Sequence, residues 1–263
     1  MAFVEIHFRG HAVHKDATLY AILPERAEAA GPFPVLYLLH GLSDDHTIWH
    51  RRTRLEWYVR DLPLIVVMPD GGRGFYCDAA DGAAYESHLI QDVVGLADRF
   101  LPTIAERRGR VIGGLSMGGY GAMKLALKRP EMFCSVAAHS GCHAVVRRLA
   151  EHNRLPDHDE LTPELLRIYG LPPRPDEDPF ALAERIDRSR LPAIRFDCGT
   201  EDFLLDHNRE FHAHLERLGI AHEYEEFPGA HNWDYWDQHV REALAFHCRA
   251  LGIQPISAAA AAD

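Results

Sequence analysis

Short apolar runs alternate along this chain with segments whose apolar residues recur every three or four positions, and this pattern restricts the fold severely. Such alternation is typical of βαβ units, in which helices join the parallel strands of one sheet. We therefore expect an α/β fold with a mostly parallel central sheet of about eight strands, helices on both faces, and an antiparallel hairpin at the start. The predicted strands are 4–8, 18–23, 35–39, 64–68, 110–113, 135–139, 193–197 and 222–227, and the predicted helices are 53–62, 86–100, 117–128, 208–218 and 235–250.

The segment 151–188 interrupts this alternation, because it holds six of the 16 prolines and only short apolar groups. We interpret it as an insertion of short helices that covers a substrate site. A solvated linker is the alternative, although a structureless loop of this length is uncommon inside a compact domain. We expect a single domain over 1–256, with a cap-like insertion at about 143–190, and a disordered alanine-rich tail at 257–263.

Composition argues against several classes of protein. The net charge of −11, from 28 Lys+Arg against 39 Asp+Glu, disfavours binding to nucleic acids or anionic membrane surfaces. The longest apolar runs are strand-sized, whereas a helix needs roughly 20 apolar residues to span a bilayer. The first residues lack the apolar stretch of a secretory signal. The five cysteines are an odd number without C-x-x-C spacing, which indicates free thiols and a cytoplasmic protein.

A G-x-S-x-G sequence at 114–118 lies between the strand at 110–113 and the helix at 117–128. A serine on such a tight turn projects its hydroxyl from the sheet, and Gly114 and Gly118 avoid collisions around it. The start of the helix also directs backbone N–H groups and its positive dipole end toward this point. A plain glycine-rich turn is the alternative, but the strand and helix on either side favour Ser116 as a nucleophile.

A serine hydroxyl needs a base, and the base needs an orienting carboxylate; after a strand–G-x-S-x-G–helix unit, the acid and then the histidine follow in the sequence. Asp202 follows the predicted strand at 193–197 and is the expected acid. His231 is the one of 18 histidines in the loop after the final strand, and is the expected base. Glu201 and Asp206 remain alternatives to Asp202, and Asp197 is expected in a structural role within its strand.

Ester chemistry places negative charge on a carbonyl oxygen, which two backbone N–H groups can stabilise. The residue after the nucleophile, Met117, supplies one of them. Leu42 supplies the other, because it follows the His40-Gly41 turn after the third predicted strand; a simple strand-ending turn is the alternative. Several aromatic residues, together with His40, are expected near the same edge of the sheet and could line a substrate pocket: Trp49, Phe75, Tyr76, Tyr120, Trp233 and Trp236.

No metal site is predicted. Asp206, His207 and His212 lie close together in the sequence but match no recognised ligand spacing such as H-E-x-x-H.

From about Val35 to His247 the chain resembles the esterase D-type branch of the α/β-hydrolases, which includes S-formylglutathione hydrolases, tributyrin esterases and feruloyl esterases. The resemblance rests on the motifs at 39–43, 68–72, 85–86, 114–122, 198–204 and 229–236. It implies the α/β-hydrolase fold, catalytic roles for Ser116, Asp202 and His231, and an oxyanion hole formed by Leu42 and Met117.

The match to the tributyrin esterases is the better one, because Ser43-Asp44 stands where S-formylglutathione hydrolases usually have Thr-Cys. The resemblance therefore implies a serine carboxylesterase for short-chain acyl esters of small molecules, in the cytoplasm and without metal or organic cofactor. An S-formylglutathione hydrolase or feruloyl esterase is the alternative, and acyl transfer or a non-catalytic binding role are further ones. A homo-oligomer is compatible with this resemblance.

Overall fold

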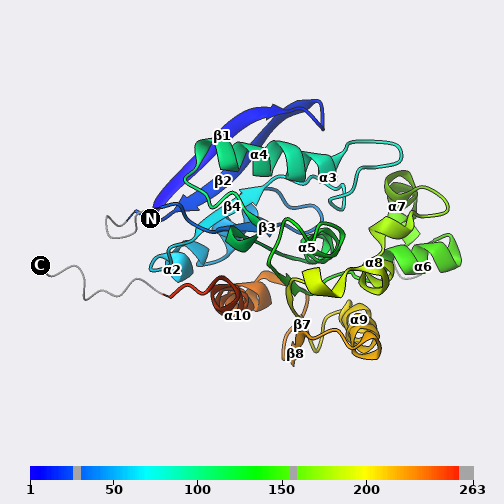
Figure 1. The fold of residues 1–263 in the computed structure, drawn as a ribbon. Helices are drawn as coiled ribbons and strands as arrows, with labels where there is room; N and C mark the ends of the chain where they lie inside the picture. Colours follow the sequence, from blue (N-terminus) through cyan, green and yellow to red (C-terminus); the bar gives the residue numbers. More distant parts are fainter. Residues whose placement is uncertain (26–30, 155–158, 255–263) are drawn as a thin grey trace, which may run out of the picture.

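The computed structural model describes residues 1–25, 31–154 and 159–254, and its described strands form one eight-stranded sheet in the order β1-β2-β4-β3-β5-β6-β7-β8 (Figure 1). Strands β3 to β8 are parallel, whereas β1 and β2 form an antiparallel hairpin and β2 pairs antiparallel with β4. The predicted α/β-hydrolase fold is confirmed. The strands are β1 Ala2–Gly10, β2 Lys15–Leu23, β3 Val35–Leu39, β4 Ile65–Pro69, β5 Arg110–Leu115, β6 Ser135–His139, β7 Ala193–Gly199 and β8 Glu223–Phe227.

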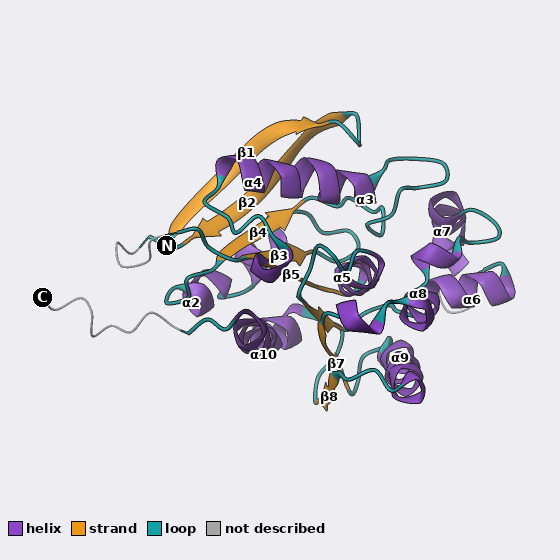
Figure 2. Cartoon of the chain, viewed as in Figure 1, coloured by secondary structure: helices purple, strands orange, loops and turns teal. Residues whose placement is uncertain are grey.

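Two hydrophobic layers cover the two faces of the sheet. Alternate residues of a strand point to opposite faces, so Tyr37 and Leu39 of β3 belong to one layer while Leu36 and Leu38 belong to the other. The first layer packs on α4 (Val94–Phe100), α5 (Met117–Lys128) and α9 (Leu205–Leu218). The second packs on α1 (Ile48–Arg52), α2 (Leu55–Val59) and α10 (Trp233–Leu251), as Figure 2 shows for α2 and α10. Central strands β3, β4 and β6 are buried throughout, which explains their unbroken apolar runs.

Two predicted helices differ from the structure. The helix expected at 53–62 is the shorter α2, and α1 precedes it. Thr53 separates them, because its hydroxyl donates to the Trp49 carbonyl of α1 and accepts from the Leu55 N–H at the start of α2. The helix expected at 86–100 consists of α3 (Tyr85–Ser87), a π-helical turn over His88–Val93, and α4. No helix within the described ranges has the length and hydrophobicity to cross a bilayer.

The segment between β6 and β7 contains helices α6 (Val145–His152), α7 (Thr162–Tyr169) and α8 (Pro179–Arg185), together with short 3₁₀ turns at Asp159–Leu161, Pro175–Glu177 and Arg188–Arg190. This helical segment is the insertion expected from the sequence, and α6, α7 and α8 gather at one end of the molecule (Figure 1). The extent of the single domain stays a prediction. Residues 155–158 of the insertion and the predicted tail at 257–263 lie outside the described residues.

A buried cluster of four charged side chains anchors this insertion to α5. The Lys124 ammonium is fully buried between Glu86 Oε2 at 3.0 Å and Glu177 Oε2 at 2.8 Å, and Lys128 Nζ lies 3.0 Å and 3.2 Å from the same two carboxylates. Tyr120, also on α5, donates its hydroxyl hydrogen bond to the Glu177 carbonyl at 2.6 Å. The helix that begins directly after Ser116 is thus bound to the insertion.

Candidate active site

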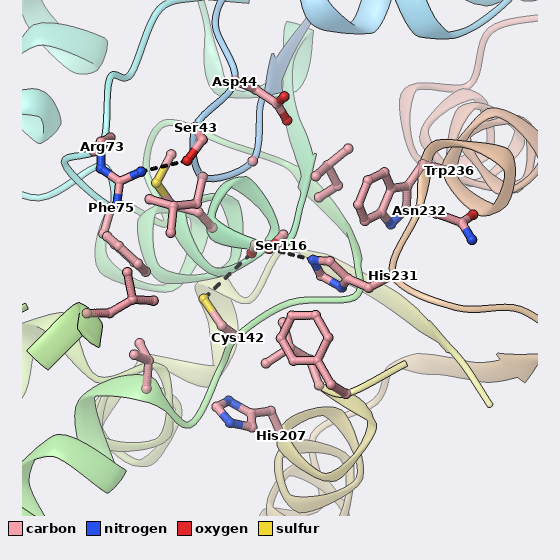
Figure 3. Close-up of a pocket in the computed structure, with 18 of the residues that line it drawn as sticks. Ser43, Asp44, Arg73, Phe75, Ser116, Cys142, His207, His231, Asn232 and Trp236 are labelled. Atoms are coloured by element: carbon pink, nitrogen blue, oxygen red, sulfur yellow. Dashed lines mark hydrogen bonds between the residues drawn. The ribbon is translucent and has the colours of Figure 1, made fainter. Parts of the chain in front are cut away.

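Ser116 lies on a sharp turn between β5 and α5, with φ 53° and ψ −119°, in a backbone region that L residues rarely adopt. The neighbouring chain segments approach closely: a Cβ on Gly114 would lie 2.7 Å from the Gly118 backbone, and a Cβ on Gly118 would lie 2.5 Å from the Leu39 carbonyl oxygen. The steric requirement for both glycines that the sequence indicated is therefore present. This turn leaves the Ser116 side chain at the carboxyl edge of the sheet, facing His231 (Figure 3).

Ser116, His231 and Asp202 form a continuous chain of hydrogen bonds. The Ser116 Oγ lies 3.0 Å from His231 Nε2, and His231 Nδ1 lies 3.0 Å and 2.9 Å from the two carboxylate oxygens of Asp202. A carboxylate can only accept, so Nδ1 carries the ring proton. In the neutral ring Nε2 is then free to accept the proton of the Ser116 hydroxyl.

The environment of Asp202 favours its ionised form. Burial raises the pKa of this carboxyl, but the hydrogen bonds and charge of His231, with further hydrogen bonds from the Leu204 N–H and the Ser140 hydroxyl, lower it to a net value below the usual range. Ser140 is itself fully buried at φ 50°, and it accepts a hydrogen bond from Trp236 Nε1 at 3.2 Å. Asp202 is thus held as a carboxylate facing the imidazole.

The other acidic residues considered from the sequence are directed elsewhere. Glu201 accepts hydrogen bonds from the Gly229 N–H and the Thr200 hydroxyl. Asp206 lies in the first turn of α9, and Asp197 is buried against His139 and Tyr235. Among the four candidates, the structure brings Asp202 to His231.

Two aromatic rings contact the His231 imidazole. The ring of Phe203 lies 4.4 Å from it between centroids, and the ring of Trp236 lies 4.9 Å away, edge to face. Asn232, the next residue, caps α10 by accepting from the Tyr235 N–H. The loop that carries His231 therefore ends in a capped helix, which holds its backbone in place.

The two residues whose backbone N–H groups are expected to form an oxyanion hole line the same cavity as Ser116. Met117 is the first residue of α5, where the N–H groups lack partners within the helix. Leu42 follows β3 in a loop that is fixed from below: the Gly71 N–H donates to His40 Nε2 at 2.8 Å, and the Tyr76 hydroxyl donates to the His40 carbonyl at 3.0 Å. Both Leu42 and Met117 line the cavity.

The cavity above Ser116 has a volume of about 630 Å³ and a largely apolar lining. Phe75, Trp233 and Trp236 contribute to it, as expected from the sequence. The insertion contributes Val145, Arg148, Glu160 and Leu161. Helix α7 of the insertion is also joined to the core, because Glu164 accepts two hydrogen bonds of 2.8 Å and 2.6 Å from Arg73. Arg73 also donates a hydrogen bond to the Ser43 hydroxyl (Figure 3).

Four of the residues predicted for the pocket lie beneath it instead: His40, Trp49, Tyr76 and Tyr120 are each at most 1% exposed and do not line the cavity. Their polar atoms bind backbone groups, such as the Leu39 carbonyl, which accepts from Trp49 Nε1 at 3.0 Å. They support the loops around Ser116 from the protein interior, which corrects the sequence-based assignment.

Cys142 is a cavity residue that the sequence did not indicate. Its Sγ lies 3.8 Å from the Ser116 carbonyl oxygen, and burial raises the pKa of its thiol to about 12. A thiol with this pKa is protonated at neutral pH and is a poor nucleophile. Ser116, and not the adjacent cysteine, has a base within reach.

The structure also brings together three potential metal ligands, His212, Glu216 and His222, a combination that the sequence did not indicate. His212 and Glu216 lie four residues apart on α9, and His222 follows the next turn, so that one ligand atom from each lies within 4.8 Å of the others. The i, i+4 spacing on a helix was the available signal, but the third member comes from outside the helix.

Comparison with known proteins agrees with this geometry. The family model described as "Putative esterase" matches residues 10–247. An acetyl esterase from Caldicellulosiruptor saccharolyticus is 28% identical, with 93% of this chain and 97% of that protein covered. The solved structure of a substrate-bound fluorophosphonate-binding serine hydrolase, FphF, from Staphylococcus aureus is 28% identical, with TM-score 0.80 and 93% and 97% of the two chains covered.

An S-formylglutathione hydrolase from Staphylococcus aureus, solved as the apoenzyme, is 27% identical, with TM-score 0.80 and 93% and 98% of the two chains covered. The resemblance seen in the sequence motifs is thereby confirmed. The chain belongs to the esterase family of the α/β-hydrolases and is a carboxylic ester hydrolase of the serine-hydrolase type.

Proposed function

We propose that this esterase cleaves short-chain acyl esters with Ser116 as the nucleophile, His231 as the general base and Asp202 as the residue that orients His231. The observation that carries the proposal is the hydrogen-bond chain from Ser116 Oγ through both nitrogens of His231 to Asp202, with every link between 2.9 Å and 3.0 Å. Such a chain is what activates a serine hydroxyl, which is otherwise a weak nucleophile at neutral pH.

In the first half of the reaction, Ser116 Oγ attacks the ester carbonyl carbon while its proton passes to His231 Nε2. The tetrahedral intermediate collapses, the alcohol leaves with the proton from His231, and the acyl group stays on Ser116. In the second half, a water molecule gives a proton to His231 and attacks the acyl group, which releases the carboxylic acid. Asp202 stays ionised throughout and stabilises the imidazolium.

The Leu42 and Met117 N–H groups would bind the oxygen that becomes negative in each tetrahedral intermediate. The dipole of α5 adds to this effect, because its positive end lies at Met117. In the proposed reaction, His231 transfers the protons, and Asp202 and the two backbone N–H groups stabilise the charges. The proposed reaction therefore requires no metal or organic cofactor.

The lining of the cavity supports an apolar acyl group, and a relative supports a short one. The cavity is mainly apolar, and the insertion contributes side chains to its lining. The acetyl esterase relative, which aligns over 93% of this chain, is named for a two-carbon acyl group. The proposed substrates are therefore small-molecule esters with short acyl chains.

The test is hydrolysis of p-nitrophenyl esters from acetate to palmitate by the wild-type protein and by Ser116→Ala. We expect the wild type to prefer short acyl chains. The variant should lose at least roughly 10³-fold in kcat, because the substitution removes both the nucleophile and its hydrogen bond to His231. The fold of the variant is checked by circular dichroism. Labelling by a fluorophosphonate should occur in the wild type alone, and a variant that keeps its activity would disprove the role of Ser116.

Thioester hydrolysis is a second candidate function, favoured by the alignment with an S-formylglutathione hydrolase over 93% of this chain. Adding S-formylglutathione and methyl ferulate to the same assay compares kcat/KM among the candidate substrates. Dominant turnover of S-formylglutathione would replace the short-chain ester as the proposed substrate, and product formed with added alcohols would reveal acyl transfer.

We further propose a cytoplasmic location and no role in binding nucleic acids or membranes. The five cysteines, all unpaired, support a reducing compartment, and the net charge of −11 supports weak attraction to phosphate groups. Fractionation of the source cells would test the location. Self-association is tested by light scattering of the purified protein.

A further inference from the structure

Three potential metal ligands meet on the surface formed by α9 and the start of β8, and none of the three lines the Ser116 cavity. His212 and Glu216 occupy successive turns of α9, and His222 immediately precedes β8. Their ligand atoms lie within 4.8 Å of one another, and His212 Nδ1 lies 2.7 Å from His222 Nε2. In Figure 1, α9 lies beside β8, at the edge of the sheet.

The tautomer of His222 is set by the backbone. Its Nδ1 lies 2.7 Å from the Ile220 carbonyl oxygen, so Nδ1 carries the proton and Nε2 presents its lone pair to His212. A ring N–H donated to a backbone carbonyl is also the arrangement that orients histidines bound to metals, because it fixes the tautomer and raises the basicity of the opposite nitrogen.

Stacking contacts hold both imidazole rings in position. The His222 ring stacks on Phe196 at 5.6 Å between centroids, with 14° between the ring planes, and the His212 ring stacks on Tyr224 at 4.6 Å and 24°. The nearby Glu226 carboxylate accepts hydrogen bonds from Arg209 and from the Tyr224 hydroxyl. The two imidazoles and the exposed Glu216 carboxylate are therefore the groups available at this point.

We propose that His212 Nδ1, His222 Nε2 and a Glu216 carboxylate oxygen bind a divalent transition-metal ion, for which Zn²⁺ is the representative. Two imidazoles and one carboxylate are nitrogen and oxygen donors that suit Zn²⁺ and related ions better than Ca²⁺ or Mg²⁺. Water completes the coordination, because the site faces solvent. The site is separate from the ester chemistry proposed for Ser116, and either proposal can fail alone.

Binding requires only a small rearrangement. Ligand atoms around tetrahedral Zn²⁺ lie roughly 3.3 Å apart, given bonds of about 2.0–2.1 Å, so the two ring nitrogens must separate by roughly half an ångström. Two bonds to the metal replace the hydrogen bond between the rings, and the His212 proton is then carried on Nε2. Glu216 reaches the ion by rotating its exposed side chain.

A bound ion would connect two segments that lead to the hydrogen-bond chain at Ser116. Helix α9 begins at Leu205, shortly after Asp202, and β8 ends at Phe227, shortly before His231. The expected effect is higher thermal stability of the loaded protein, because the ion binds the folded arrangement and not the separated ligands.

The test is calorimetric titration of the EDTA-treated, gel-filtered protein with ZnCl₂ in a non-chelating buffer. We expect one equivalent to bind with a micromolar dissociation constant. The constant should be at least roughly tenfold higher in His212→Ala and in His222→Ala, and raised to a smaller degree in Glu216→Gln. The control is His11→Ala, which removes another exposed histidine in the β1–β2 turn and should leave binding unchanged.

A second measurement works on the wild type alone. Diethyl pyrocarbonate modifies accessible histidines, and mass spectrometry should show that Zn²⁺ protects His212 and His222 and leaves His11 reactive. The proposal is overturned if the wild type binds Zn²⁺ only at millimolar concentration, if His212→Ala and His222→Ala bind it as the wild type does, or if the ion protects neither histidine.

Discussion

Glu177→Gln tests whether the buried cluster of Lys124, Lys128, Glu86 and Glu177 holds the insertion to the core. The Glu177 side chain is 1% exposed, and its carboxylate contacts Lys124 at 2.8 Å, Lys128 at 3.2 Å and Arg174 at 3.0 Å. Glutamine keeps the shape of the side chain and removes its negative charge. The substitution therefore preserves the packing but leaves the buried lysine ammonium groups with fewer negative charges beside them.

The size of the effect follows from the proton affinity of Glu177. Burial would raise the pKa of this carboxyl, but the charges and hydrogen bonds of Lys124, with contributions from Cys77 and Lys128, lower it from 4.5 to about 2. At about 1.4 kcal/mol for each pH unit, this lowering corresponds to about 3 kcal/mol of folding free energy at neutral pH. Breaking one side of a buried ion pair costs a similar amount, about 3–5 kcal/mol.

The pH dependence of the loss identifies its cause. A carboxyl whose pKa is lower in the folded state stabilises fully above 4.5, and this contribution disappears as the pH falls toward 2. Urea unfolding should therefore show a constant difference of about 3 kcal/mol between wild type and Glu177→Gln from pH 5 to 7, and a smaller one at pH 4. Glu131→Gln, at an exposed glutamate, should change stability by less than about 0.5 kcal/mol. A loss below about 1 kcal/mol, or one that persists unchanged at pH 4, would refute the reasoning.

Three other substitutions test the site and its support. Gly118→Ala places a Cβ 2.5 Å from the Leu39 carbonyl oxygen and should cost about 1–3 kcal/mol in thermal unfolding and lower kcat/KM. Ser140→Ala removes a hydrogen bond that lowers the pKa of Asp202. We expect kcat to fall at nearly constant KM and the acid limb of the pH–rate profile to move to higher pH. An acid limb that does not move would contradict a positioning role for Ser140. His143→Leu removes a buried imidazole, and burial lowers the pKa of this imidazole to about 3. As the pH falls below 6.5, the wild type should lose up to about 1.4 kcal/mol of stability per pH unit more than the variant loses. Urea unfolding at several pH values measures this difference.

The sheet and the chain of hydrogen bonds at Ser116 could be predicted because both depend on local pattern and chain order. Apolar runs mark the strands, and the carboxyl ends of parallel strands meet at one edge of a sheet. Ser116, Asp202 and His231 each follow a strand closely, so their sequence positions indicate that they converge. Short loops then set the orientation of these side chains, and glycines and helix caps restrict the conformation of the loops.

Side-chain direction and distant contacts could not be predicted in the same way. A loop that follows a strand can direct its aromatic side chains into a cavity or into the protein interior, and the side chains of Trp49 and Tyr76 are buried in the interior. The contacts between Arg73 and Glu164, and between Lys124 and Glu177, join residues 91 and 53 positions apart. No periodicity in one segment indicates the partner that lies in another, and the same holds for the third residue of the histidine group, His222.

Among the described strands, β8 is the last at one edge of the sheet, and its composition affects how that edge meets other molecules. Glu223 and Glu225 are exposed there, at 46% and 49% of their side chains. Unpaired strands readily recruit strands from other molecules, and charged side chains oppose this. Both carboxylates form ion pairs with Arg195, and Glu223 also pairs with Arg249. A second copy that extended the sheet through β8 would have to accommodate two sets of these charged side chains at the junction. The charged side chains of β8 therefore disfavour the strand-to-strand growth that leads to aggregation.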